Sequence, residues 1–260
     1  MINMRRSVLI AVLLVLALTC AARLAAEQKV LFQNSTLQAL MNGVYDSDYS
    51  FGELKKHGDF GLGTFEALDG EMVAVDGKFY QVKTDGRAYP VSPAQKTPFG
   101  EVTFFKADKT LALSEPLDLK QLESYLAKQL PSQSFPYAIK ITGKFSYIKT
   151  RSVPRQAKPY PPLAEVAKHQ KVFEFQDVDG VIVGFFHPQY LTGVNVGGYH
   201  CHFLTRNRRA GGHLLDCRIQ QAKVELSQMN DIDLRLPGTA AFSRTDLSGD
   251  KKQEIEKVER

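Results

Sequence analysis

After about residue 26 the chain alternates apolar and polar positions over short runs, the pattern of β-strands that bury one face. Asp-Gly pairs at 69–70 and 76–77 divide the segment 63–82, which is therefore predicted to be a meander of three strands. The segment 137–153 is predicted to be a hairpin or a long bent strand pair. Further strands are predicted at 98–105, 172–175, 180–186, 197–204, 211–217 and 222–236.

Three segments instead repeat apolar residues at the three-and-four spacing of an amphipathic helix. The clearest is 117–130, where leucine and tyrosine residues share one face and Pro131 ends the pattern. A short helix is predicted within 31–43, capped by Ser35 or Thr36, and another at 163–170. Because strands outnumber helices, the predicted fold class is α+β, with two β-rich halves, mixed sheets and a few packing helices.

The proline-rich stretch 154–162 is the best candidate for an internal boundary. It predicts an N-terminal sheet domain at 27–153 and a C-terminal sheet domain at 154–260. The last residues, 243–260, are polar and charged, a composition typical of a frayed helix at a chain end.

Residues 1–26 differ from the rest, because Arg5 and Arg6 precede an apolar run that ends in small residues. This is the pattern of a secretory signal peptide, so the protein is predicted to be exported, to the periplasm or the medium, after cleavage at Ala26. A lipoprotein signal ending at Cys20 and a retained anchor are the alternatives, although the apolar run is short for a membrane span. No stable membrane contact is expected after cleavage.

The net charge of +5 is largely a property of this leader. Losing its three arginines reduces the 33 basic residues to 30 against 28 acidic ones, a charge of about +2. The sequence has no lysine-rich tract and no aromatic platform interleaved with basic residues, so a nucleic-acid partner is not expected. With 43% apolar residues, the 260-residue chain can bury a sizeable core.

Half of the six histidines fall within fourteen residues, in a predicted hairpin whose loop is basic and contains glycine. On a strand, His200 and His202 point to the same face. If His202 pairs with His213, all three imidazoles converge within a few ångströms. Three neutral imidazoles with a fourth position open to water or substrate are the ligand set of a catalytic Zn²⁺ site, here on a hairpin of the C-terminal half. Ordinary half-exposed strand histidines are the alternative.

The cysteines fit a metal site less well. Cys201 lies between the two histidines and points to the opposite face, whereas Cys217 has the parity of His213 but lies four residues beyond it. This opposite parity argues against a disulfide within the hairpin, so both residues are predicted to be free thiols, even in an exported protein.

Several segments, in order along most of the chain, carry a family resemblance. They are 58–65 (Gly-Asp-Phe-Gly-Leu-Gly-Thr-Phe), 68–71 (Leu-Asp-Gly-Glu), 98–105, 137–153, 197–202, 211–213 (Gly-Gly-His) and 234–237 (Leu-Arg-Leu-Pro). With these segments the chain resembles the acetolactate decarboxylases, carboxy-lyases of acetoin biosynthesis that convert 2-acetolactate to acetoin and CO₂. The resemblance implies a single small-molecule substrate.

The resemblance also implies site residues. It places zinc on His200, His202 and His213, and adds Arg151, Glu71 and an acid close to the C-terminus. Glu254, Glu256 and Glu259 compete for that last position, and the isoleucine-x-x-x-glutamate ending of the family points to Glu259. In such an enzyme Zn²⁺ stabilises the enediolate left by CO₂ loss, Arg151 holds the carboxylate, and the acids contact the metal or handle protons.

Two other function classes remain open from the sequence. A cupin-like metal-dependent oxygenase or isomerase also carries His-x-His on a strand, but its usual glutamate is missing because 203–207 contains no acid. An exported metal-binding module without catalysis would need the histidines but neither Arg151 nor the glutamates. The sequence leaves the oligomeric state open, with a homodimer as one option.

Overall fold

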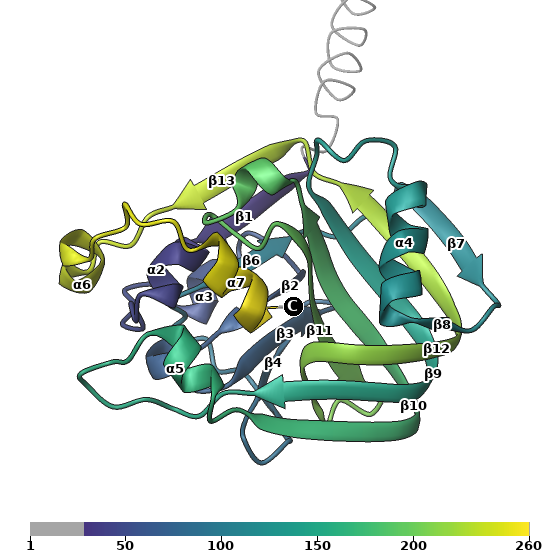
Figure 1. Ribbon diagram of the computed structural model, residues 1–260, viewed down its shortest axis with the longest axis horizontal. Helices are drawn as coiled ribbons and strands as arrows, with labels where there is room; N and C mark the ends of the chain where they lie inside the picture. Colours follow the sequence, from purple (N-terminus) through teal and green to yellow (C-terminus); the bar gives the residue numbers. More distant parts are fainter. Residues whose placement is uncertain (1–28, 260) are drawn as a thin grey trace, which may run out of the picture.

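The computed structural model describes residues 29–259, and its strands form two sheets that pack against each other (Figure 1). Side chains from the first sheet, such as Leu62 and Val73, share one buried cluster with Val183 and Phe185 of the second. The predicted signal peptide at 1–26 lies outside the described residues.

The first sheet has seven strands in the order β13-β1-β6-β2-β3-β4-β5. The sheet is mixed, because β1 pairs with β13 in parallel and all other strand pairs of the sheet are antiparallel. Its strands are β1 Val30–Asn34, β2 Phe60–Thr64, β3 Glu71–Val75, β4 Lys78–Val82, β5 Ala88–Pro90, β6 Gly100–Thr103 and β13 Asp231–Arg235.

The second sheet is antiparallel and follows the order β11-β10-β9-β12-β7, with the short β8 paired to β12. Because β11 also pairs with β12, the strands β11, β10, β9 and β12 close into a ring. Its strands are β7 Lys109–Leu113, β8 Leu117–Asp118, β9 Tyr137–Ser152, β10 Lys171–His187, β11 Gly198–Thr205 and β12 Gly211–Gln228.

Short helices cover the sheets (Figure 1). The longest, α4, begins at a capping box formed by Asp118 and Gln121, and buries Leu122 and Leu126 against the second sheet. The predicted cap Thr36 begins α2 by accepting a hydrogen bond from the amide of Ala39. The helices are α2 Leu37–Met41, α3 Phe51–Leu54, α4 Leu119–Gln129, α5 Leu163–Ala167, α6 Ala240–Arg244 and α7 Lys252–Glu259, with 3-10 turns at Glu66–Leu68 and Gln189–Leu191.

The α+β class is confirmed, and so is the short helix predicted within 31–43, which is α2. Two local predictions were wrong. The segment 137–153 is one continuous strand, and 172–175 and 180–186 belong to a single strand, β10. The glycines inside these strands permit close approach: a Cβ on Gly143 would lie 2.2 Å from the carbonyl oxygen of Gln221, and one on Gly180 would lie 2.3 Å from the Phe203 ring.

The division between the sheets does not coincide with the expected boundary at residue 153. β9 precedes that boundary and belongs to the second sheet, whereas β13 follows it and completes the first. The chain therefore crosses between the sheets twice, and this exchange of strands brings residues from both halves to one place. Within residues 29–259, each helix falls short of the length and apolar content needed to cross a bilayer.

Candidate metal centre

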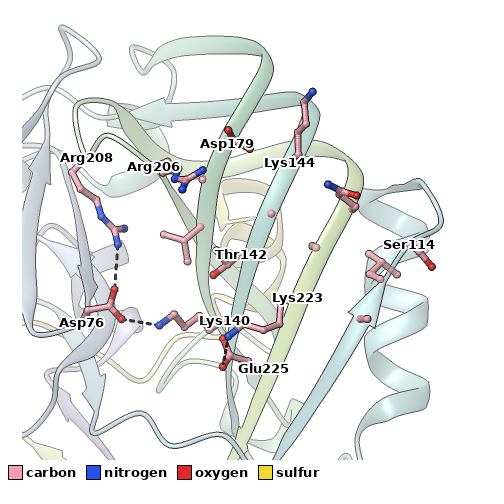
Figure 2. Close-up of a pocket in the computed structure, with 17 residues that line it drawn as sticks. Asp76, Ser114, Lys140, Thr142, Lys144, Asp179, Arg206, Arg208, Lys223 and Glu225 are labelled. Carbon is pink, nitrogen blue, oxygen red and sulfur yellow. Dashed lines mark hydrogen bonds and ion pairs between the residues drawn. The ribbon is translucent and has the colours of Figure 1, made fainter.

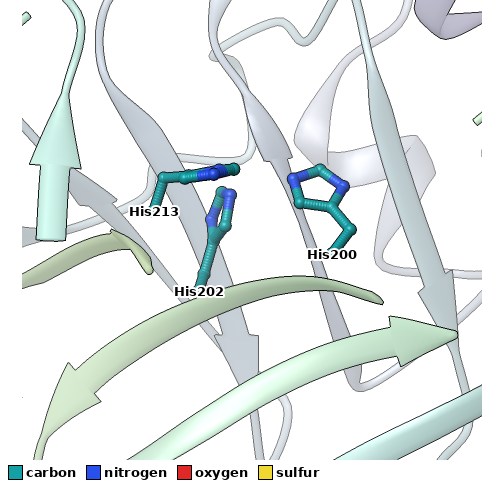
Figure 3. A group of neighbouring side chains, drawn as sticks. All are labelled: His200, His202 and His213. Carbon is teal, nitrogen blue, oxygen red and sulfur yellow. The ribbon is translucent and has the colours of Figure 1, made fainter. Parts of the chain in front are cut away.

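Three histidines meet at the join between β11 and β12 (Figure 3). His202 pairs with His213, which confirms the register expected of the hairpin. One possible ligand atom from each of His200, His202 and His213 lies within 4.8 Å of the others, and all three side chains are buried. The cluster could therefore hold a metal ion.

The three other predicted residues lie around this cluster. Oε2 of Glu259 is 3.5 Å from Nε2 of His200, 3.6 Å from Nδ1 of His213 and 3.4 Å from Nη2 of Arg151. Oε2 of Glu71 lies 3.8 Å from Nε2 of His202. All six residues named by the resemblance are thus brought to one buried site, although they come from four strands and the last helix.

Strand pairing explains how Arg151 reaches the site. Arg151 is opposite His213 in the pairing of β9 with β12, and His213 is in turn opposite His202. The three residues therefore form one row across three adjacent strands. Nη1 of Arg151 also donates a hydrogen bond of 3.2 Å to Oε1 of Gln170, which fixes one end of the guanidinium.

The two glutamates arrive from opposite ends of the described chain. Glu71 begins β3, directly after a left-handed turn in which Leu68 has φ of 57° and Gly70 has φ of 92°. Glu259 ends α7, a helix anchored by Ile255 and Val258 in an apolar cluster that also contains residues of α2 and α5. The segment expected to be a frayed end therefore folds back over the site (Figure 1).

Burial controls the protonation of the site. It lowers the pKa of His202 to about 3, although the hydrogen bond to the carbonyl of Met72 opposes this shift. Burial also lowers the pKa values of His200 and His213 well below their ordinary range, with further lowering by Arg151 and neighbouring imidazoles. At neutral pH the three imidazoles are therefore uncharged, which is the form that binds a metal.

The pKa values of the two carboxyl groups shift in the opposite direction, upward. Burial raises the pKa of Glu71 to about 8, against the lowering effect of Arg151 and with a smaller increase from Glu259. Burial likewise raises the pKa of Glu259, while Arg151 lowers it. In the metal-free protein Glu71 is therefore mostly protonated at neutral pH and can donate a proton.

The chemistry of the donor set fits a metal ion. Among residues 29–259, both ring nitrogens of His200 and Nε2 of His213 are buried without a hydrogen-bond partner. Leaving a buried polar atom unpaired costs about 1–3 kcal/mol. Coordination through these imidazoles would offset part of that cost.

The cysteines lie outside this donor set. Cys201 and Cys217 are free, as predicted, but the parity assigned to Cys217 was wrong. A register shift between Leu214 and Asp216 turns Cys217 toward the apolar cluster below α4, where Cys201 also packs. Burial raises the pKa of Cys217 to about 12 and that of Cys201 still further, so both remain thiols.

A surface cavity of about 790 Å³ lies away from this site and contains none of these six residues (Figure 2). Eight of its 17 lining residues are charged, and several of them neutralise each other. Lys140 and Arg208 lie 2.7 and 3.2 Å from Asp76, and Lys223 lies 3.0 Å from Glu225. These paired surface charges are consistent with a solvated groove.

Sequence reasoning missed two buried residues beside the cluster, Glu101 on β6 and His187 at the end of β10. Nε2 of His187 lies 2.9 Å from Oε2 of Glu101, and Nδ1 of His200 lies 3.7 Å from Oε1. Glu101 stands alone as an acid in a short strand, and no spacing links it to the histidine hairpin. A charged residue at a position fully buried by strand alternation was the one signal that could have found it.

Comparisons with known proteins agree with the resemblance. The family profile described as Alpha-acetolactate decarboxylase matches residues 31–249. The chain is 49% identical over 231 residues to the alpha-acetolactate decarboxylase of Methanosarcina mazei, covering 89% of this chain and 80% of the relative. It is 47% identical to that of Methylococcus capsulatus, covering 91% of each. The crystal structure of alpha-acetolactate decarboxylase from Bacillus subtilis strain 168 superposes with a TM-score of 0.87 at 41% identity, covering 88% of this chain and 99% of that one.

Proposed function

Since this chain belongs to the alpha-acetolactate decarboxylase family, we propose that it converts 2-acetolactate to acetoin and CO₂ with Zn²⁺ held by His200, His202 and His213. The carboxy-lyase activity follows from the family, whereas the metal is our inference. One observation supports it above the others: three buried imidazole nitrogens lie within 4.8 Å of one another, beside a buried arginine and two buried glutamates.

Zinc suits this donor set better than Mg²⁺ or Ca²⁺ does. Neutral imidazoles are typical Zn²⁺ ligands, and three of them leave a position for substrate, as in other catalytic zinc sites. Mg²⁺ and Ca²⁺ prefer oxygen ligands, of which the cluster itself has none. Glu259 lies close enough to His200 and His213 to complete the coordination after a small side-chain movement.

The reaction requires charge stabilisation and one proton. Loss of CO₂ from 2-acetolactate moves the electrons of the broken carbon–carbon bond toward the neighbouring ketone, leaving an enediolate that must be protonated on carbon to give acetoin. A bound Zn²⁺ would supply a Lewis acid for the ketone oxygen.

Arg151 is the residue that would hold the substrate carboxylate. Its guanidinium is buried, and it is held by Gln170 on one side and Glu259 on the other. Nε of Arg151 is buried without a hydrogen-bond partner among the described residues. Its N–H can therefore still donate a hydrogen bond to the substrate carboxylate. A guanidinium binds a carboxylate through two parallel hydrogen bonds, which would orient the bond that breaks.

Glu71 is the better candidate for the proton donor. It lies on the His202 side of the cluster, whereas Glu259 contacts Arg151, and burial raises the pKa of Glu71 in the metal-free protein. Donation of this proton to the enediolate carbon leaves Glu71 as a carboxylate, which regains a proton from solvent before the next turnover.

Substrate access requires movement. The cavity between Glu71, Arg151 and the histidines has a volume of about 20 Å³, enough for one ion or water but not for 2-acetolactate. Helix α7 is attached by the apolar contacts of Ile255 and Val258 and carries Glu259, so it is the natural element to open and close over the site.

The activity assay tests this proposal directly. Purified protein should release acetoin and CO₂ from 2-acetolactate, lose this activity after dialysis against a chelator, and regain it with Zn²⁺. A cupin-like oxygenase would consume O₂, and a binding module would form no product. Unchanged turnover in protein shown by elemental analysis to be metal-free would contradict the zinc proposal.

Changing Glu71 should separate proton transfer from metal binding. In Glu71→Gln the amide has the same size but cannot donate a proton as the acid does, so we expect turnover to fall by roughly 10²–10⁴-fold, the usual contribution of a general acid. Zinc content should stay within error of the parent protein. Glu66→Gln is the control, because Glu66 lies in the same turn region and its carboxylate contacts the amide of Ser47 rather than the cluster. Equal turnover in Glu71→Gln and the parent would rule out the proton-donor role.

We also propose that the protein acts outside the cytoplasm after cleavage following Ala26, because the basic start, apolar run and small residues of 1–26 form an export signal. Cell fractionation and N-terminal sequencing should find a mature protein that begins at Glu27 in the periplasm or medium. Activity confined to the cytosol with an intact leader would contradict this.

A further inference from the structure

Glu101 is a carboxylate that the proposed reaction does not use, although it lies directly behind the metal cluster. It projects from β6 of the first sheet and its side chain is fully buried. Among residues 29–259, two imidazoles lie beside its carboxyl oxygens, with Nε2 of His187 at 2.9 Å and Nδ1 of His200 at 3.7 Å, although neither contact has the geometry of a hydrogen bond. A buried carboxylate without charge or hydrogen-bond compensation is costly, so its surroundings need an explanation.

Strand pairing puts the two imidazoles side by side. His200 on β11 is opposite Phe185 on β10, and His187 follows two positions later on β10. Positions two apart share a face, so His187 and His200 are diagonal neighbours on the face that meets the first sheet. Glu101 reaches this face from the other sheet and places one oxygen at each ring.

The atoms that face one another fix the role of His200. Its Nδ1 points to Glu101, whereas its Nε2 lies 3.5 Å from Glu259, on the metal side. A neutral imidazole has a proton on one nitrogen and a lone pair on the other. A carboxylate beside Nδ1 favours the proton there, and Nε2 is then left with the lone pair that a metal requires.

His202 has a closer support, which is a hydrogen bond. Its Nδ1 lies 2.8 Å from the carbonyl oxygen of Met72, which likewise favours the proton on Nδ1 and leaves Nε2 for the site. The two histidines of the His-x-His pair are thus oriented by different groups, one by a neutral backbone oxygen and the other by a carboxylate. The carbonyl of Met72 makes a hydrogen bond, whereas the carboxyl oxygen of Glu101 lies 3.7 Å from Nδ1 of His200, beyond hydrogen-bond distance.

We propose that Glu101 is a positioning residue for the metal ligand His200, and that His187 holds the second oxygen of Glu101 so that the first faces Nδ1. This inference rests on the proposed metal site. Glu101 touches neither the metal position nor the substrate, so its effect should appear in metal affinity, which a purely structural carboxylate would leave unchanged.

The test measures the dissociation constant for Zn²⁺ alone, by competition with a chromophoric chelator, in metal-free protein. Glu101→Gln keeps the size of the side chain and removes its charge, and we expect Zn²⁺ to bind about 10–100-fold more weakly, the usual effect of removing such a partner. The thermal stability of the metal-free variant should be equal or higher, because a buried charge is gone.

The control is Cys201→Ala, next to His200 on the same strand but packed on the opposite face. It perturbs β11 without approaching Glu101, so its Zn²⁺ affinity should stay within about twofold of the parent. Parent-like Zn²⁺ affinity in Glu101→Gln would overturn the inference while leaving the proposed function intact. A parent protein that binds no Zn²⁺ would overturn both.

A second variant covers the case in which Glu101→Gln does not fold. His187→Gln removes the ring that faces Oε2 and leaves Glu101 and His200 in place. We expect Zn²⁺ to bind about threefold more weakly or worse, because Glu101 loses one of its two supports. Unchanged affinity in this folded variant would show that His187 and Glu101 do not position His200.

Discussion

Replacing any one of His200, His202 or His213 by alanine should abolish both Zn²⁺ binding and decarboxylation while leaving the protein folded. A catalytic zinc site with three protein ligands loses most of its affinity when one is removed, because two imidazoles and water no longer fix the coordination. The fold should survive, since the sheets are held by extensive apolar clusters in which the three imidazoles take no part. Elemental analysis, circular dichroism and the acetoin assay together measure these effects.

His169→Ala is the matched control. His169 is exposed just after α5 and makes no contact with the cluster, so this variant should keep full zinc content and turnover. Stoichiometric zinc in all three cluster variants would contradict the metal assignment. Loss of folded structure in the cluster variants alone would instead show that the histidines, or a metal they hold, stabilise the fold.

The histidine cluster could be predicted because it depends only on residues close together in the sequence. Alternation places His200 and His202 on one face, and the short loop fixes the register that brings His213 opposite His202. The same local argument failed for Cys217, because a β-bulge after Leu214 shifts the register by one residue. No residue type in this segment indicates a bulge in advance.

Longer strands were harder to predict because a glycine can lie either in a turn or inside a strand. Gly143 and Gly180 resemble turn residues, yet each lies inside a strand where a neighbouring backbone or aromatic ring leaves no room for a Cβ. Only the partner strand distinguishes the two cases. The exchange of β9 and β13 between the sheets is a tertiary property of the same kind, and no local pattern at 154–162 could reveal it.

Arg151 and Glu259 illustrate what family resemblance adds. Composition alone favours a surface salt bridge for an arginine on a basic strand and a frayed end for a charged tail. The structure places both groups in a buried site, 3.4 Å apart, because β9 pairs with β12 and α7 packs through Ile255 and Val258. Neither contact follows from spacing along the chain.

Arg151→Lys should reduce turnover by about two orders of magnitude or more while the protein keeps its zinc. Lysine retains the positive charge, but a single ammonium cannot offer the two parallel hydrogen bonds that orient a carboxylate. It also cannot reach Gln170 and Glu259 at once, as the guanidinium does through Nη1 and Nη2. Losing preorganised stabilisation of this kind typically costs about 10²–10³ in turnover.

The control for this substitution is Arg155→Lys, because Arg155 lies four residues along the chain, is mostly exposed and only approaches Asp69 at 3.9 Å. An exposed pair of this kind contributes little, so this variant should match the parent. Steady-state kinetics and zinc analysis of both variants decide the question. If Arg151→Lys turned over at the parent rate, charge alone would suffice at this position, and another group would have to hold the substrate carboxylate.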